Sequence, residues 1–325
     1  MRVSNIKKAS AQPNKVTELD LSGQDLKRLP DAVRKLTKLR RLELAGNRLK
    51  DLPEWLPELK TLRELDYSGN GLKEIPEIIS QLTGLEALKL GEDPFKELPE
   101  SLLSLKKLKR LELVGVQLKD LPAWLSKASI QDLVLVFCPK MAGLPKVIKE
   151  LKQLKRLELA DLEFDSLPDW LGQLGLEELA LGRLNIGSLP ASLFKSDLRV
   201  LNLTDLDDLG IPSGLTNMKG LTQLTICPGD TQEGEDFVPA ELGKLTNLEE
   251  LHLINIQFSS LPAWLGKLKK LRRLTAFGEG LTEPPKVLGS LPKLEFVDLG
   301  FAPELAGQEA AVQALVPNAE LVMPT

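Results

Sequence analysis

The stretch LRRLELAGNRLKDLPEWLPELKT, residues 39–61, decides the fold of this chain because its pattern returns many times along the sequence. Leu42 and Leu44 are two residues apart, so both side chains point to one face of a strand. Pro53 has a fixed φ and no N–H, which suits the first turn of a short helical segment that carries Leu56. One unit is therefore predicted to hold a strand, a bend and a short helical return.

Thirteen such units follow one another at spacings of 22 to 27 residues. They begin at Val16, Leu39, Leu62, Leu85, Leu108, Ile130, Leu154, Leu176, Leu198, Leu221, Leu248, Leu271 and Leu294. A period in the twenties is typical of a solenoid, in which each unit contacts only its neighbours and one core grows with the number of units. We therefore expect one domain over 16–325, with one parallel strand per unit.

The two ends of the array are predicted to differ from its middle, because an open core end faces water. Residues 1–15 are polar and are expected to form either a short cap or a partly disordered segment. Residues 308–316, QEAAVQALV, have the pattern of an amphipathic helix that closes the last coil before Pro317.

The units resemble those of the leucine-rich repeat family. The string from Leu52 to Asn70 is similar to the intracellular 23-residue class, which includes plant Ras-group proteins, the animal Ras-pathway scaffold and bacterial proteins. The string from Val136 to Leu159 resembles the repeat region of plant intracellular immune receptors. The resemblance implies a right-handed α/β horseshoe with a parallel sheet on the concave face and short helices or turns on the convex face. It also implies binding of proteins.

The resemblance places Asn47 and Asn70 in the asparagine ladder of the family, whose side chains bond backbone groups of adjacent turns. Most other units depart from this pattern. The same slot holds Gln24, Asp93 and Cys138, so the middle units are expected to satisfy their turn backbone in another way.

Composition narrows the classes of partner. The formal net charge is −4, which disfavours a nucleic-acid partner. The start of the chain lacks an apolar leader and no stretch is long and apolar enough for a membrane span, so we expect a cytoplasmic monomer, or a protein delivered into a host cell. Cys138 and Cys227 lie four units apart, too far for a disulfide, and are expected to be reduced.

The sequence predicts neither an enzyme nor a cofactor. His252 is the only histidine, no motif sets a nucleophile beside it, and neither a zinc ligand set nor a phosphate-binding glycine loop is present. The long tenth unit carries an acidic segment, 228–236, whose carboxylates suggest calcium, but the spacing of an EF-hand loop is missing. The other interpretations of this segment are a solvated loop and a contact with a partner.

The outward strand positions change in character along the array. Over the first eight units the first two outward slots hold nine acids and four bases, whereas over the last five they hold two acids and one base. The predicted protein-binding residues lie in the apolar C-terminal third: His252, Ile254, Thr275, Phe277, Phe296 and Phe301. A secondary acidic ladder is predicted to attract a basic partner: Asp20, Glu43, Asp66, Glu112 and Glu158.

Each of these surfaces has an alternative interpretation. The three phenylalanines could fold under the C-terminal helix as part of its cap, and the acids could pair with bases on neighbouring strands. The leading functional hypothesis is a non-catalytic scaffold that binds a protein on the concave face. The alternatives are a bacterial effector or immune-receptor recognition region, as part of a longer protein with an activity elsewhere, and an array without a partner.

Overall fold

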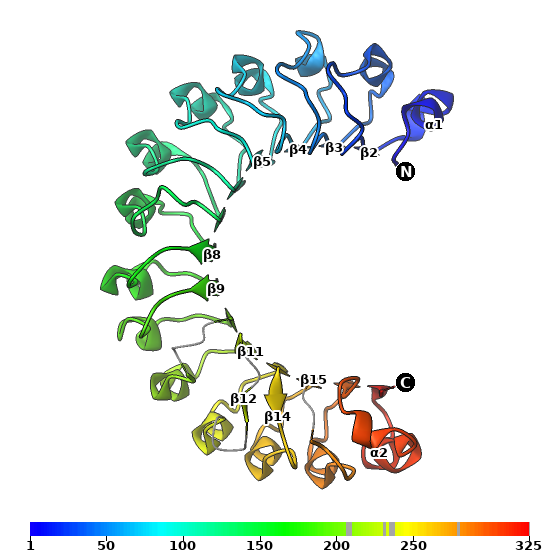
Figure 1. Cartoon of the computed structure of the whole chain (residues 1–325), viewed down its shortest axis with the longest axis vertical. Helices are drawn as coiled ribbons and strands as arrows, with labels where there is room; N and C mark the ends of the chain where they lie inside the picture. Colours follow the sequence, from blue (N-terminus) through cyan, green and yellow to red (C-terminus); the bar gives the residue numbers. More distant parts are fainter. Residues whose placement is uncertain (206–209, 230–231, 234–237, 278–279, 325) are drawn as a thin grey trace. The chain divides into compact units, whose positions relative to one another are not determined.

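The computed structural model describes residues 1–205, 210–229, 232–233, 238–277 and 280–324. The chain forms two compact units, Met1–Glu163 (unit 1) and Phe164–Thr325 (unit 2). Within each unit, strands lie side by side on one face and short helices stand on the opposite face (Figure 1). We call these the strand face and the helix face.

Unit 1 contains eight parallel strands in the order of the sequence. They are β1 (Arg2–Val3), β2 (Glu18–Asp20), β3 (Arg41–Glu43), β4 (Glu64–Asp66), β5 (Ala87–Gly91), β6 (Arg110–Val114), β7 (Asp132–Val136) and β8 (Arg156–Leu162). Paired residues lie one repeat apart, as Leu42 and Leu65 do, so equivalent leucines stack from unit to unit.

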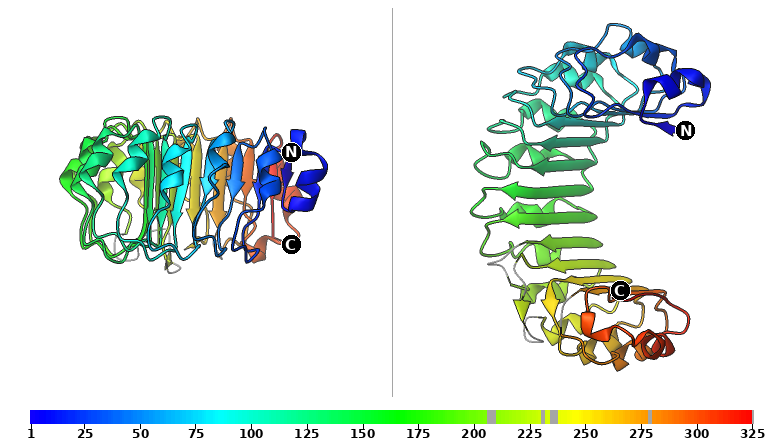
Figure 2. Two further views of the ribbon diagram at one scale, coloured as in Figure 1. Left: turned by 90° about the horizontal axis from the view of Figure 1, so that it is seen from above. Right: turned by 45° about the vertical axis from the view of Figure 1, so that its right-hand side comes forward.

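Unit 2 continues with the same parallel pairing, which Figure 2 shows as adjacent arrows. Its main strands are β9 (Glu178–Leu184), β10 (Val200–Thr204), β11 (Gln223–Cys227), β13 (Glu250–Ile254), β15 (Arg273–Phe277), β16 (Phe296–Asp298) and β17 (Glu320–Val322). A separate pair is formed by β12 (Gln232–Glu233) and β14 (Ile256–Gln257).

The helical returns are 3₁₀ helices in every repeat for which the structure records one. They are η2 (Asp31–Lys35), η3 (Leu56–Glu58), η4 (Glu77–Gln81), η5 (Glu100–Ser104), η6 (Ala123–Lys127), η7 (Lys146–Glu150), η8 (Asp169–Gln173), η9 (Leu193–Lys195), η10 (Ser213–Asn217), η11 (Ala240–Lys244), η12 (Ala263–Lys267) and η13 (Lys286–Ser290). The repeat proline precedes each one, and its carbonyl accepts the first hydrogen bond, as Pro30 does from Val33 at 3.0 Å. A 3₁₀ helix rises about 2.0 Å per residue, so few residues suffice for the return.

The core of each unit consists of the leucines that face between the strands and the helices. Leu42, Leu44, Leu111 and Leu113 have at most 1% of their surface exposed. The predicted solenoid, with a parallel sheet on one face and short helices on the other, is therefore confirmed. Each of the thirteen predicted repeats contributes one strand to the described part of the chain.

The two ends carry strands that the sequence pattern does not reveal. At the N-terminus, β1 pairs with β2 and is followed by α1 (Ile6–Ala11), which buries Ala9, and by η1 (Pro13–Lys15). At the C-terminus, η14 (Pro303–Leu305) and α2 (Glu309–Leu315) lead into β17, which pairs with β16. Residues 1–15 therefore contain ordered elements.

The hydrogen bonds of the asparagine ladder are present in the first repeats. The Asn70 amide donates to the carbonyls of Leu44, Tyr67 and Ser68 at 3.1–3.2 Å, and its oxygen accepts the N–H of Leu49 at 2.9 Å. Asn47 bonds the preceding turn in the same way.

A cysteine takes over the ladder position in a later repeat. The Sγ of Cys138 lies 3.9 Å from the carbonyl oxygen of Leu113 and 3.7 Å from that of Val136. These are weak bonds, and burial raises the pKa of this thiol to about 11. The thiol is therefore a neutral filler of the turn. Both Cys138 and Cys227 are free.

Candidate protein-binding surface

The predicted binding residues come together on three neighbouring strands of unit 2. In register, His252 on β13 lies opposite Thr275 on β15, and Ile254 lies opposite Phe277. Phe296 on β16 lies opposite Arg273 of β15. These positions alternate with the buried leucines because successive side chains of a strand point to opposite faces. The strand register therefore places these six residues on one face of the sheet.

Phe301 completes this surface from the loop after β16. Its ring centroid is 4.8 Å from that of Phe277, with the two planes tilted by 54°. Such tilted pairs are favourable beyond the area they bury. Phe301 nevertheless stays 66% exposed, and Phe277 is half-buried. The pair is therefore not enclosed beneath α2, contrary to the cap interpretation for Phe301.

Phe296 is held by a neighbour that the sequence analysis did not select. The guanidinium carbon of Arg273 lies 4.4 Å from the centroid of the Phe296 ring, within the range of a cation–π interaction. Arg273 occupies the first outward slot on the adjacent strand, so its position could have been read from the repeat register. The four apolar residues Ile254, Phe277, Phe296 and Phe301, together with Arg273, are called the aromatic patch below.

His252 and Thr275 form a polar row that lies between Phe296 and the pair of Ile254 and Phe277. The Nδ1 of His252 is 3.0 Å from the Thr275 hydroxyl oxygen, and its Nε2 is 3.7 Å from the Glu250 carboxylate. Burial lowers the pKa of His252, although Glu250 opposes this shift. The imidazole of His252 is therefore neutral at neutral pH.

The carboxylate, imidazole and hydroxyl of this group do not form a nucleophilic site. The contact of His252 with Glu250 is longer than a hydrogen bond, and Thr275 is only 7% exposed. Among the described residues, no group of three or more His, Cys, Asp or Glu is arranged to hold a metal ion. The acidic segment 228–236 lies largely outside the described residues.

The acidic ladder of unit 1 lies on its strand face, and most of its carboxylates are paired with bases. Asp20, Glu43 and Asp66 are in register on β2, β3 and β4. Lys89 and Glu112 follow on β5 and β6, so a lysine interrupts the row. The pairing alternative considered from the sequence is therefore realised over these strands.

The ion pairs of the ladder use bases from the same unit. Arg2 approaches Asp20 at 3.5 Å and Glu43 at 3.3 Å, and Lys89 approaches Asp66 at 3.5 Å. The backbone N–H of Ser22 is the main cause that lowers the pKa of Asp20. The remaining pairs are Arg41 with Glu43 and Arg110 with Glu112, at 2.7 and 2.5 Å. Four of the five acids are thus neutralised within the unit, while Glu158 is exposed.

No helix in the described part of the chain is long and apolar enough to cross a membrane. The 3₁₀ helices described above are all too short to do so.

Comparisons with known proteins agree with the repeat geometry. A family model described as a leucine-rich repeat region matches residues 15–127. A leucine-rich repeat protein of Leptospira interrogans is 25% identical, with a TM-score of 0.64 over 99% of this chain and 99% of that chain. An internalin, InlF, of Listeria monocytogenes is 18% identical, with a TM-score of 0.58 over 90% and 91% of the two chains.

A third solved structure, the complex of PEPR1 with AtPEP1, is 26% identical, with a TM-score of 0.50 over 91% of this chain and 43% of that one. A search of curated proteins gives no match. The matched repeat region, the stacked strands and the asparagine ladder lead to one assignment: residues 15–127 match a leucine-rich repeat region, and the chain has the fold of leucine-rich repeat proteins.

Proposed function

We propose that this chain is a non-catalytic recognition protein that binds a protein partner through the aromatic patch of unit 2. The observation that carries the proposal is Phe301, which stacks on Phe277 yet leaves 66% of its surface in water. Exposed aromatics that lie together mark contact sites, since a few buried aromatic residues carry most of the energy of a protein interface.

The surroundings of the aromatic patch suit a protein surface better than a small ligand. The patch lies on an open sheet face across β13, β15 and β16, and the polar row of His252 and Thr275 runs between its apolar residues. Protein interfaces mix apolar and polar area in this way, whereas sites for small ligands are concave. PEPR1, a structural relative, was solved together with AtPEP1.

We also propose that the protein is a monomer and that it works in a reducing compartment. Two free cysteines, one of them buried, support such a compartment. The small net charge of −4 supports a protein partner over a nucleic acid.

The double variant Phe277→Ala/Phe301→Ala tests the proposal. Partners are captured from an extract of the source cells with the tagged parent, and their affinities are then measured by calorimetry. We expect the variant to bind the captured partner about tenfold more weakly or worse, because the removed rings would be buried in the complex. Circular dichroism spectra are expected to match those of the parent.

The matched control is Glu43→Gln/Glu112→Gln, which changes the ladder of unit 1. Its affinity is expected to stay within about twofold, because these acids already pair with Arg2, Arg41 and Arg110. If the control abolishes binding while the aromatic double variant binds like the parent, the site assignment is wrong.

A further inference from the structure

One edge of unit 1 gathers lysines from three neighbouring repeats. It is formed by the linkers, the segments that join each helical return to the next strand, together with the ends of the returns. Six lysines lie there: Lys106, Lys107, Lys109, Lys127, Lys149 and Lys152. Three of them follow η5, one ends η6, and two lie at the end of η7. We call these six lysines the basic edge.

Stacking of the repeats brings the basic edge together. The return η5 packs beside η6, and η6 packs beside η7. The linkers are hydrogen-bonded in series, because the N–H of Gln131 donates to the carbonyl of Lys109 and the N–H of Lys155 donates to that of Gln131, each at 2.8 Å. Neighbouring strands are about 4.8 Å apart, so the three repeats span roughly 10 Å beside the sheet. The six lysines therefore form one cluster.

The basic edge is exposed and keeps most of its charge. One acid lies among the lysines, Glu150, and its carboxylate is 3.7 Å from Lys152, whose side chain remains 80% exposed. Such an exposed pair contributes little. The other five lysines are exposed and form no ion pair with any described residue. Six bases and one acid leave a formal charge of +5 here, on a chain whose net charge is −4.

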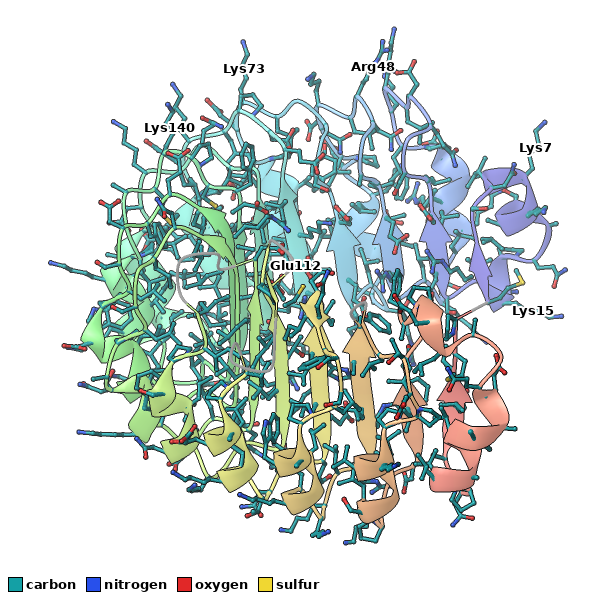
Figure 3. All side chains as sticks on the ribbon, turned by 60° about the horizontal axis from the view of Figure 1, so that its bottom comes forward. Lys7, Lys15, Arg48, Lys73, Glu112 and Lys140 are labelled. Carbon is teal, nitrogen blue, oxygen red and sulfur yellow. The ribbon has the colours of Figure 1, made fainter. Side chains whose placement is uncertain are left out.

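The opposite edge of the same repeats lacks this excess of bases. It consists of the loops that lead from β5, β6 and β7 to the returns, and Figure 3 shows Lys140 projecting from the last of these loops. The bases of these loops are Lys96, Lys119 and Lys140, and the acids are Glu92, Asp93, Glu97 and Asp120. Three bases and four acids give a formal charge of −1. Strands of five residues, about 17 Å long, separate the two edges.

A small apolar surface lies within the basic edge. The linker after η6, residues 128–131, is one residue shorter than the other linkers of unit 1, and beside it lies an apolar cavity of about 20 Å³. Trp124, which lines this cavity together with Lys106 and Lys127, is half-buried. Its indole N–H donates to the carbonyl of Leu98 at 3.3 Å, which fixes the ring. Lysines therefore flank a partly exposed indole.

We propose that the basic edge is a docking surface for the anionic phospholipids of a membrane, which unit 1 contacts without crossing the bilayer. Lysines near a membrane surface are attracted by anionic headgroups, and each contributes about fivefold in affinity. The indole of Trp124 suits the boundary between headgroups and acyl chains, because one part of the ring system is apolar and the other is polar.

A membrane fits these observations better than a nucleic acid does. All six bases are lysines, which act as point charges, and none is an arginine, whose planar fork holds phosphates by paired hydrogen bonds. Proteins that bind single strands stack successive bases on aromatic side chains, whereas this edge offers one indole that is already fixed against the protein. Attraction to a membrane needs neither feature. The cytoplasmic leaflet carries the anionic lipids, which agrees with the reducing compartment proposed above.

The test is sedimentation of the whole chain with lipid vesicles. The parent is expected to bind vesicles of phosphatidylcholine with about one third phosphatidylserine, and not vesicles of phosphatidylcholine alone. The variant Lys106→Gln/Lys107→Gln/Lys109→Gln is expected to bind the anionic vesicles about a hundredfold more weakly, because it loses three lysines that contribute about fivefold each. High salt is expected to weaken binding of the parent, because it screens the charges.

The matched control removes the same charge from the opposite edge. The variant Lys96→Gln/Lys119→Gln/Lys140→Gln is expected to bind the anionic vesicles within about threefold of the parent, because these lysines lie roughly two Debye lengths further from the membrane at physiological salt. All six substituted side chains are exposed, so the thermal unfolding of both variants should match that of the parent.

Three results would overturn the membrane surface. One is a parent that does not sediment with the anionic vesicles. Another is an equal loss of binding in the two triple variants, which would reduce the effect to net charge. The last is a parent that binds labelled duplex DNA more tightly than the vesicles, with that binding lost in the Lys106→Gln/Lys107→Gln/Lys109→Gln variant, which would assign the edge to a nucleic acid. The variant Phe277→Ala/Phe301→Ala should sediment like the parent, so this test is independent of the aromatic patch of unit 2.

Discussion

Replacing Leu113 by alanine is expected to lower the free energy of unfolding by about 2–5 kcal/mol, the range for truncated buried leucines. Leu113 lies in β6 with 0% of its surface exposed, and its register partners are Leu90 and Leu135. The cavity would be enclosed by equivalent leucines from both neighbouring repeats, which the stacked strands hold in place. Unfolding in urea, followed by circular dichroism, measures the loss.

The matched control changes the residue next to Leu113 on the other face of the same strand. Glu112→Ala is expected to cost about 0–1 kcal/mol, because its ion pair with Arg110 is partly exposed to solvent. Equal losses in the two variants would mean that the faces of β6 are assigned the wrong way round.

Replacing Asp93 by asparagine is expected to raise the free energy of unfolding by about 1–3 kcal/mol at neutral pH, the cost of one buried polar atom left without a partner. Asp93 is 3% exposed and occupies the ladder position that Asn47 and Asn70 hold in earlier repeats. Its Oδ1 accepts the N–H of Leu72 at 2.7 Å, but no described residue bonds its Oδ2.

The geometry of the ladder explains why an amide suits this position better. The amide of Asn70 donates to the carbonyls of Leu44 and Tyr67, and the equivalent carbonyls for Asp93 belong to Tyr67 and Leu90. A carboxylate has no proton to offer them, whereas an amide or a protonated carboxyl does. Asp93→Asn therefore supplies the missing donor.

The gain from Asp93→Asn is expected to depend on pH. Burial is the main cause that raises the pKa of Asp93 above 3.8, and the N–H of Leu72 opposes this shift. Below pH 3.8 the carboxyl is protonated in both the folded and the unfolded chain, so its burial does not lower the free energy of unfolding of the parent there. Above 3.8 the unfolded chain loses the proton first, and the stability of the parent falls until the pH passes the raised pKa.

Urea unfolding of the parent and Asp93→Asn at several pH values checks this sign. The difference between them should be smallest at acidic pH and should reach a plateau at neutral pH. Asp66→Asn, on the exposed face, is the control and should change little. A constant difference across the pH range would contradict a raised pKa at Asp93.

The sequence alone predicted the features that repeat within one unit. The alternation of Leu42 and Leu44 with polar residues predicted which face of each strand is buried, and the proline predicted where each helical return begins. The repeat register also placed Ile254 beside Phe277. These features are local, because strand periodicity and the geometry of proline act over a few residues.

The tertiary structure decided what depends on neighbours a repeat away. It paired the acidic ladder with Arg2, Lys89 and Arg110, because long side chains choose among partners on both adjacent strands. It also added β1 and β17 at the ends, where too few residues remain for a full repeat pattern.

The conformation of Phe137 shows the limit of the sequence most clearly. Its position holds glycine in several repeats and glutamate, aspartate or arginine in others, so residue type does not disclose the positive φ. The turn is imposed by hydrogen bonds between repeats, such as the one from Phe137 to Ala160. The sequence by itself thus determined the repeating strand and its core, whereas only stacking against the neighbouring repeats decided which exposed residues are strained, paired or left available for a partner.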